Sequence, residues 1–398
     1  MKKIQFKLCI VLLSVAVLFT FLACGDRDDD DNDKQTNQNG QNGQNGGGPV
    51  TEKQALTTMK KYITDVVVHF KGRIYSWDVL NEVFPDGVNA NADWKTAMRT
   101  NNPWYKAIGS DFVYEGFLAA RLADPDAILY YNDYNLDNVG KATMVRNMVK
   151  AVNDKYLASS DKPAGESAVR LLIEGIGMQS HHNTNVQASS IKNSLDLFKP
   201  LGVKISISEL DVLAQGYSSA LEGANKPPAT GNNLTLQATR YSEYIAVFLQ
   251  YTDIIERVTL WGLTDDKSWR SAGQPLLFDA SGKAKEAYYK FVSGTGSGED
   301  IMNLTPMKDK FSANFMMGNI FNPSDVSGSS VTNARLTRHF NVLTAENNMK
   351  PSYISPSQGT YNFTTADNMV NAARASGFKV VGHTLLWHSQ NASWMNNL

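Results

Sequence analysis

Cysteine is almost missing from this sequence. The chain has 398 residues and two cysteines, Cys9 and Cys24, and both precede the part whose composition can support a fold. No disulfide framework and no cysteine metal site is therefore available. The formal net charge is only −1, which leaves no electrostatic footprint for nucleic acid. A neutral sugar polymer would suit such a surface, as would many other ligands. With 42% hydrophobic residues, the chain can build one large domain or two small ones.

The first 24 residues have the features of an export signal. A head with three lysines precedes an apolar run from Leu8 to Leu22, which is short for a membrane span. The segment from Phe21 to Cys24 resembles a bacterial lipobox, and the acidic stretch behind it resembles a tag for the outer face of the cell. These features imply export, lipidation at Cys24 and anchoring at the surface of the outer membrane. A plain secretory signal is the alternative.

Residues 25–48 are acidic and then rich in repeated Gln-Asn-Gly, which is typical of a flexible tether. Folding is expected over residues 49–398, and Thr51 and Gln54 have the spacing of a capping box. Beyond them, helical faces alternate with apolar strand runs. The expected helices cover 52–70, 111–122, 139–157, 190–198, 236–251, 283–292, 331–339 and 365–376. The expected strands cover 74–81, 127–134, 171–179, 203–208, 257–263, 315–320, 340–345 and 378–387.

This alternation of long apolar strands with helices predicts an α/β fold, a parallel (β/α)8 TIM barrel. One feature of the order is unusual. The chain opens with a helix and closes with the strand at 378–387, which would leave an exposed edge unless the two ends of the barrel lie side by side.

Two glutamates are placed where barrel enzymes carry their chemistry. The strand at 74–81 leads directly into Glu82, and the β-rich run Val203 to Val212 carries Glu209. A buried, unpaired carboxylate is costly, whereas strand tips of a parallel barrel hold catalytic groups. Two glutamates on two such strands are what a retaining glycosidase uses as acid/base and nucleophile. The structural alternative is that either glutamate pairs with a core arginine.

Six strings of residues resemble the motifs of glycoside hydrolase family 10, the endo-β-1,4-xylanases. The resemblance covers nearly everything from Thr51 to Leu398, and the six together are specific although each alone is weak. The strings are Trp77–Glu82, Gly175–His181, Ile207–Asp211, Leu260–Arg270, Glu346–Lys350 and Gly382–Gln390.

The order of these strings departs from the family. Residues 49–293 resemble the family's C-terminal part, and residues 306–398 resemble its N-terminal part, with a joining loop at 294–305. We interpret this as a circular permutation of one barrel, with the new ends in the loop after the family's third strand, since permutation is tolerated at exposed loops. The alternative is two partial domains of a longer tandem protein.

The resemblance also implies roles for individual residues. Glu82 would be the acid/base and Glu209 the nucleophile, supported by Asn81, His181 and Asp211. Trp261 and Trp269 would cover the cleft and crowd the C6 position, which favours xylose over glucose. Either tryptophan could instead fill the core, and a lone histidine is more often a satisfied core residue. The substrate-binding residues implied are Glu346, Asn347, Lys350, His383, Trp387, Gln390, Tyr134, Gln179, Trp261 and Trp269.

The resulting expectation is a monomeric, surface-tethered, retaining endo-1,4-β-xylanase that acts on xylan or xylo-oligosaccharides. Its alternatives are a non-catalytic xylan-binding lipoprotein and another retaining β-glycanase, such as a cellulase or mannanase. No cofactor and no metal are expected, and membrane contact is expected only through Cys24. A zinc site formed by His181, His383 and His388 lacks any metal-ligand spacing. His69 and His339 are expected at helix ends on the surface.

Overall fold

A computed structural model describes residues 50–214 and 231–398 of the chain. The predicted signal, Cys24 and the tether at 25–48 lie outside the described residues. Within them, no helix is long and apolar enough to cross a membrane.

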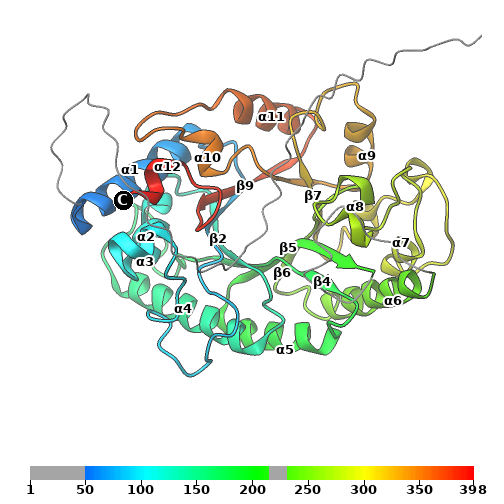
Figure 1. Ribbon diagram of the computed structural model, residues 1–398, viewed down its shortest axis with the longest axis horizontal. Helices are drawn as coiled ribbons and strands as arrows, with labels where there is room; N and C mark the ends of the chain where they lie inside the picture. The colour runs from blue at the N-terminus through cyan, green and yellow to red at the C-terminus, as the bar shows by residue number, and fades with distance from the viewer. Residues whose placement is uncertain (1–49, 215–230) are drawn as a thin grey trace, which may run out of the picture. The chain divides into compact units, whose positions relative to one another are not determined.

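Parallel strands close into a barrel, as the sequence predicts. Each strand is hydrogen-bonded to its neighbours in the circular order β1-β2-β3-β5-β6-β7-β8-β9, and β9 returns to β1. A short strand, β4, pairs with the far end of β5. Figure 1 shows the helices around these strands. The strands are β1 (Ser76–Asn81), β2 (Ile128–Asp133), β3 (Gly175–Met178), β4 (His181–Asn183), β5 (Lys204–Leu213), β6 (Ile255–Leu260), β7 (Met316–Phe321), β8 (Val342–Ala345) and β9 (Lys379–Leu386).

The last strand is not an exposed edge. β9 pairs in parallel with β1, with Ser76 opposite Val381 and Asp78 opposite His383. β6 pairs with β7 although the predicted joining loop at 294–305 lies between these two strands in the sequence. The first and last strands therefore lie side by side, which removes the unpaired edge.

In residues 50–214 and 231–398, the outer layer contains every predicted helix and four short ones that the sequence did not reveal. Helices of four to six residues are too short to show a 3.6-residue apolar period. The unexpected ones are α2, α8, α10 and α12. The helices are α1 (Glu52–His69), α2 (Pro103–Ile108), α3 (Asp111–Ala123), α4 (Val139–Ala158), α5 (Ala188–Phe198), α6 (Gly231–Phe248), α7 (Glu286–Phe291), α8 (Met307–Lys310), α9 (Val331–His339), α10 (Pro351–Ile354), α11 (Thr364–Ala375) and α12 (Ser393–Asn396).

The N-terminal helix begins with the predicted capping box. The Thr51 side chain accepts from the backbone N–H of Gln54, and the Gln54 side chain accepts from the N–H of Thr51. The buried face of α1 then packs where the two ends of the barrel meet. A Cβ on Gly116 of α3 would lie within 4 Å of Ile63, Leu80 and Leu386, so α1, α3, β1 and β9 share one tightly packed contact.

Three predicted boundaries are wrong for identifiable reasons. The strand expected at 171–179 is regular only over β3, because the backbone of Ile173 bonds to the side chain of Asn153 and not to a neighbouring strand. The helix expected at 283–292 starts at Glu286, since Lys283 and Ala284 form β-bridges. β5 extends past residue 208 to Leu213 because β4 pairs with its far end.

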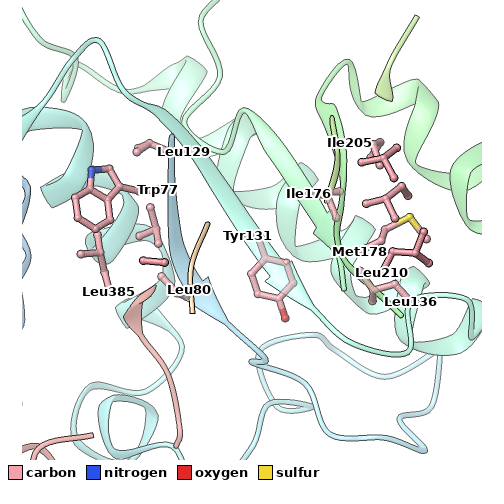
Figure 2. Packing of buried hydrophobic residues seen from close by; sticks show 14 of the residues in the cluster. Trp77, Leu80, Leu129, Tyr131, Leu136, Ile176, Met178, Ile205, Leu210 and Leu385 are labelled. Carbon is pink, nitrogen blue, oxygen red and sulfur yellow. The ribbon is translucent and has the colours of Figure 1, made fainter. Parts of the chain in front are cut away.

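Apolar side chains fill the space between the strands and the helices. Trp77, Leu80 and Leu385 gather on one side of the core, and Met178 and Leu210 on another (Figure 2). Gly382 makes room for Trp77, because a Cβ there would lie 2.3 Å from the indole ring. Apolar contact between layers of secondary structure is the main stabilising term of such a fold.

The inside of the barrel is polar. The hydroxyls of Tyr75 and Tyr130 donate to Glu256, and Arg257 lies 4.2 Å from the centre of the Tyr130 ring. Arg257 also donates to Ser76 Oγ and lies 3.9 Å from Asp78 Oδ1. The buried arginine is thus engaged below the catalytic end, next to Asp78 and Glu256, and does not take up the two predicted catalytic glutamates.

One predicted surface histidine is in fact buried. His339 ends α9 as expected, but its exposure is 0%. Its Nε2 lies 2.8 Å from the carbonyl oxygen of Ile301, and its ring packs against Phe278. The prediction was wrong because the segment after residue 300 folds over the end of α9. His69, by contrast, is part-exposed and bonds to Asp367.

Candidate active site

The two glutamates named by the sequence lie at the carboxyl ends of β1 and β5. Glu82 follows β1 directly and has a positive φ of 56°, a backbone state that non-glycine residues adopt mainly where the surroundings enforce it. Its N–H donates to the carbonyl of Asn132 on β2. Glu209 lies inside β5, and both carboxylates are largely withdrawn from solvent, at 15% and 5% exposure.

A chain of amide side chains joins these two carboxylates. Gln179 Nε2 lies 2.9 Å from Glu82 Oε1 and 3.2 Å from Asn81 Oδ1. Asn132 Nδ2 lies 2.9 Å from Asn81 Oδ1 and 2.7 Å from Glu209 Oε1. The path Glu82–Gln179–Asn81–Asn132–Glu209 therefore holds one oxygen of each carboxylate through neutral donors.

Asn132 is a member of this chain that the sequence analysis missed. Its Oδ1 accepts from Ser208, and Gly177 leaves space for it, since a Cβ there would lie 2.1 Å from Oδ1. The only signal was its place at the end of an expected strand, beside Asp133. The reason for a glycine at position 177 becomes visible only when β2 and β3 are paired, which places Gly177 opposite Asn132.

The second oxygen of Glu209 faces a histidine. His181 Nε2 lies 3.1 Å from Glu209 Oε2, and His181 Nδ1 lies 2.9 Å from Asp211 Oδ2. Burial alone would lower the pKa of His181, but Asp211 and then Glu209 outweigh it and raise the pKa to about 9. At neutral pH the ring is therefore protonated and donates to both carboxylates. His181 is not a core histidine with neutral partners.

Asp211 also anchors the loop after β6. Trp269 Nε1 donates to Asp211 Oδ2 at 3.2 Å, and Arg270 donates to Asp211 Oδ1 at 2.6 Å. Burial alone would raise the pKa of Asp211, but His181 and Arg270 hold the pKa of this carboxyl below its usual value. Trp269 remains 56% exposed, so it lines an open surface and does not fill the core.

Aromatic contacts connect the nucleophile side to the residues expected to bind sugar. His181 lies 6.1 Å from Trp261, and Trp261 lies 5.6 Å from His383, between ring centres. His383 then lies 6.5 Å from Trp387. Lys350 Nζ lies 5.1 Å from the centre of the Trp387 ring. A continuous row of side chains therefore runs from β4 past the end of β6 to the end of β9 and Lys350.

The remaining predicted sugar contacts lie beside this surface. Lys350 donates to Asn347, Glu346 accepts from Asn322, and the backbone of Gln390 accepts from Ser352. Trp387 Nε1 and Gln390 Oε1 are buried with no hydrogen-bond partner among the described residues. Buried polar atoms are normally paired, so these two are available to a ligand rich in hydroxyl groups.

His383 is oriented from inside the barrel. Its Nδ1 lies 3.0 Å from Asp78 Oδ2, and both side chains are buried. This bond leaves Nε2 as the ring nitrogen turned away from the barrel interior. Asp78 was not among the residues named by the sequence, although it lies in the same strand as Asn81.

Tyr134 follows β2, which pairs with the edge of β1 opposite to β9. Arg99 donates to its hydroxyl, and Lys141 Nζ lies 3.3 Å from its ring centre. Lys141 also pairs with Asp133 at 2.9 Å. Burial raises the pKa of Asp133 to about 6, against the opposing effect of Lys141.

The described residues contain no group of three or more His, Cys, Asp or Glu side chains that could hold a metal ion. Of the three histidines considered for zinc, His181 uses both ring nitrogens on carboxylates and His383 bonds to Asp78. His388 Nδ1 lies 3.8 Å from Glu82 Oε2, so each of the three rings lies against a different carboxylate.

Comparison with known proteins gives a consistent picture. The sequence profile described as glycosyl hydrolase family 10 matches residues 35–294 and 306–398. Over 255 residues the chain is 36% identical to endo-1,4-beta-xylanase A of Thermotoga maritima, which covers 62% of this chain and 21% of that protein. It is 33% identical over 246 residues to an endo-1,4-beta-xylanase of Geobacillus stearothermophilus, with 60% and 68% covered.

Solved structures resemble the chain over a similar share. A GH10 xylanase with a bacterial Ig-like domain, from termite gut, is 55% identical with a TM-score of 0.56, covering 61% of this chain and 54% of that one. Xylanase XynB of Paenibacillus barcinonensis is 27% identical with a TM-score of 0.52, covering 61% and 68%. The chain therefore spans about a fifth of the length of the Thermotoga maritima relative and about half of the termite-gut one.

Proposed function

Because this chain belongs to glycosyl hydrolase family 10, we propose that it is a retaining endo-1,4-β-xylanase that cuts internal β-1,4-xylosidic bonds of xylan. The observation that carries the proposal is the pair of carboxylates, Glu82 and Glu209, joined through Gln179, Asn81 and Asn132 at the carboxyl ends of their strands. Two carboxylates held in fixed relation are what double displacement at an anomeric carbon requires.

In the first step, Glu209 attacks the anomeric carbon of the sugar on the glycone side. Glu82 gives its proton to the glycosidic oxygen, so the bond to the leaving sugar breaks as the bond to Glu209 forms. In the second step, Glu82 takes a proton from water, and the resulting nucleophile releases the sugar from Glu209. Two displacements at the same carbon return the original configuration.

The surrounding residues hold the nucleophile ready for attack. Protonated His181 and Asn132 each donate to a different oxygen of Glu209, which fixes the plane of the carboxylate. Asp211 fixes the orientation of the His181 ring. Asn81 would hold the sugar 2-hydroxyl, an interaction that strengthens as the sugar ring flattens.

The loops after β8 and β9 would bind the sugars on the glycone side. Lys350, Asn347 and Glu346 offer charged and amide groups to hydroxyls, and His383 and Gln390 add further polar atoms. Trp387 offers an aromatic face for a pyranose ring. Trp261 and Trp269 would crowd the position of a C6 hydroxymethyl group, which favours xylose over glucose. Gln179 and Tyr134 would border the cleaved bond.

Hydrolysis of xylan by the purified chain tests the proposal. We expect short xylo-oligosaccharides to appear with the β-anomer first, as followed by proton NMR, and Glu209→Gln to release none. Binding of xylan without release of reducing sugar would favour a non-catalytic xylan-binding protein. Faster hydrolysis of β-glucan or mannan than of xylan would favour a cellulase or mannanase.

We also propose that the chain is a circular permutation of the family barrel, with residues 306–398 standing for the family's N-terminal part. The parallel pairing of β9 with β1 supports this reading. A rearranged protein that starts at 306 and joins 398 to 49 should retain xylanase activity and solubility. If the rearranged protein folds and the present order does not, the alternative of two partial tandem domains gains support.

For location, we propose export and lipid anchoring at the outer cell surface through Cys24, based on the sequence of the first 48 residues. Labelling cells with a radioactive fatty acid should mark the protein, and Cys24→Ala should abolish the label. We propose a monomer, which light scattering of the folded region tests.

A further inference from the structure

A buried lysine lies on the acid/base side of the site and has no part in the chemistry proposed above. Lys141 lies in the first turn of α4, and its side chain is 1% exposed. Its Nζ lies 2.9 Å from Oδ1 of the fully buried Asp133 and 3.4 Å from Oδ1 of Asp86. The same Nζ lies 3.3 Å from the centre of the Tyr134 ring. The loop after β1, the end of β2 and the start of α4 therefore meet at one ammonium group.

Apart from its contacts with Asp133, Asp86 and Tyr134, this position is unfavourable for a lysine. The first turn of a helix carries partial positive charge, which disfavours a cation. Burial of an ammonium group is costly, and an apolar side chain of similar volume would usually stabilise the fold at least as well. The contacts of Lys141 with Asp133, Asp86 and Tyr134 therefore point to a requirement other than packing.

Of these partners, Asp133 is buried and Asp86 is exposed, and Tyr134 is the one with an aromatic ring that a sugar could contact. Its hydroxyl is held by Arg99, and Lys141 covers one face of its ring. A cation over an aromatic face is attracted by the ring and fixes its tilt. Arg99 also lies over the ring, 5.6 Å from its centre. Tyr134 is only partly buried, so the exposed part of the ring is the part that can meet a sugar.

The circular order of the strands indicates which sugar of the substrate the Tyr134 ring would contact. The proposed glycone contacts follow β8 and β9, Glu82 follows β1, and Tyr134 follows β2. Glu82 protonates the oxygen of the cleaved bond. Along the order β9, β1, β2, the glycone contacts therefore lie before Glu82, and a residue after β2, such as Tyr134, faces the leaving-group side. Asp86 lies in the loop after Glu82 and borders the same side; it is also bonded to Asn135.

We propose that Lys141 is a positioning residue for the leaving-group side of the cleft. Through its contacts with Asp133 and Asp86 it holds the Tyr134 ring at the tilt that stacks on the sugar just beyond the cleaved bond. This inference rests on the proposed xylanase function. Its consequence is that Lys141 matters for substrates that place sugars beyond the cleaved bond, and not for substrates that place none there.

Three substrates distinguish this positioning role from a role in fold stability and from a role in proton donation by Glu82. Xylohexaose occupies both sides of the cleft. Phenyl β-xylobioside has no sugar beyond the cleaved bond but needs proton donation, and 4-nitrophenyl β-xylobioside needs it much less. We expect Lys141→Met to lower kcat/KM on xylohexaose by about tenfold relative to either aryl xylobioside. Lys150→Met is the matched control, because Lys150 is on the same helix and exposed, paired with Asp154. It should leave all three rates unchanged.

The ratio of rates within one preparation does not depend on the fraction of protein that is folded. Lys141→Met leaves Asp133 buried without its cation, so the double variant with Asp133→Asn removes both charges and preserves the fold in case the single variant loses it. The double variant should show the same selective loss on xylohexaose.

Two results would overturn the inference. Equal losses on all three substrates would mean that Lys141 only stabilises the fold. A selective loss on phenyl β-xylobioside over 4-nitrophenyl β-xylobioside would mean that it acts through the acid Glu82. Absence of hydrolysis by the unaltered chain on every substrate is a different failure, because it removes the proposed function itself.

Discussion

Replacing His181 by glutamine should remove a pH-dependent part of the stability of this protein. The ring of His181 lies between Asp211 and Glu209, at 2.9 and 3.1 Å, and these carboxylates raise its pKa from 6.5 to about 9. The folded protein therefore binds this proton more tightly than the unfolded chain does. The resulting stabilisation is fully present below about pH 6.5 and is lost as the pH rises through about 9.

The size of this contribution follows from the two pKa values of His181. A change from 6.5 to about 9 corresponds to about 3 kcal/mol of unfolding free energy at low pH. Of this, about 2 kcal/mol disappears between about pH 7 and about pH 9.5, because the unfolded chain is already mostly deprotonated at the start of that interval.

Urea unfolding at these two pH values measures the effect. His182→Gln is the matched control: burial lowers the pKa of His182 to about 4, so its folded form is neutral throughout the interval. The unaltered protein and His182→Gln should lose the same stability on going to high pH. His181→Gln should lose about 2 kcal/mol less than they do. An equal loss in all three proteins would refute the assignment of a protonated His181 between the carboxylates.

Three other predictions concern the site and the fold. Glu209→Gln should lower kcat/KM on xylan by about 10⁴-fold or more. Glu82→Gln should lower kcat/KM on xylan by about 10²–10⁴-fold, and far less on a dinitrophenyl xylobioside, whose leaving group needs no proton. Similar losses of kcat/KM on both substrates would contradict the acid role of Glu82. Asn132→Ala removes one donor from Glu209 and one from Asn81, which keep His181 and Gln179. It should lower kcat by about tenfold, from about 1–3 kcal/mol for a buried Glu209 oxygen left unpaired, with little change in KM. Burial lowers the pKa of His339 to about 4, so the unfolded chain takes up the proton first and stability should fall by about 3 kcal/mol between about pH 6.5 and about pH 4; His339→Gln should flatten this fall in an acid unfolding series.

The barrel and the two glutamates at the carboxyl ends of its strands could be predicted because their signals are local. Glu82 directly follows an apolar strand and Glu209 interrupts one, and an unpaired charge in a buried strand is costly. The capping box of Thr51 lies within four residues of sequence. Strand-helix alternation needs only the apolar period of each segment. None of these signals requires knowledge of which strands pair.

The parts that were missed depend on pairing across the barrel. Asn132 bonds to Glu209 and Asn81 at separations of 77 and 51 residues, and the sequence near Asn132 contains no trace of either partner. The burial of His339 depends on where residues after 300 pass. β5 is longer than the strand predicted from its apolar residues, because β4 forms hydrogen bonds with its last residues. Such features follow from tertiary packing, which overrides local preference.

The seam between the first and last strands explains why the site need not be continuous in sequence. His383 on β9 and Asp78 on β1 are 305 residues apart, yet they form a buried bond, and Thr384 donates to the carbonyl of Asp78 at 2.7 Å. On the other flank of Asp78, Arg257 of β6 reaches across the barrel interior. The orientation of His383, and with it one wall of the sugar-binding surface, is therefore set by side chains of other strands and not by the peptide that precedes it. For this reason residues from distant parts of the sequence can form one candidate site at the carboxyl ends of these strands.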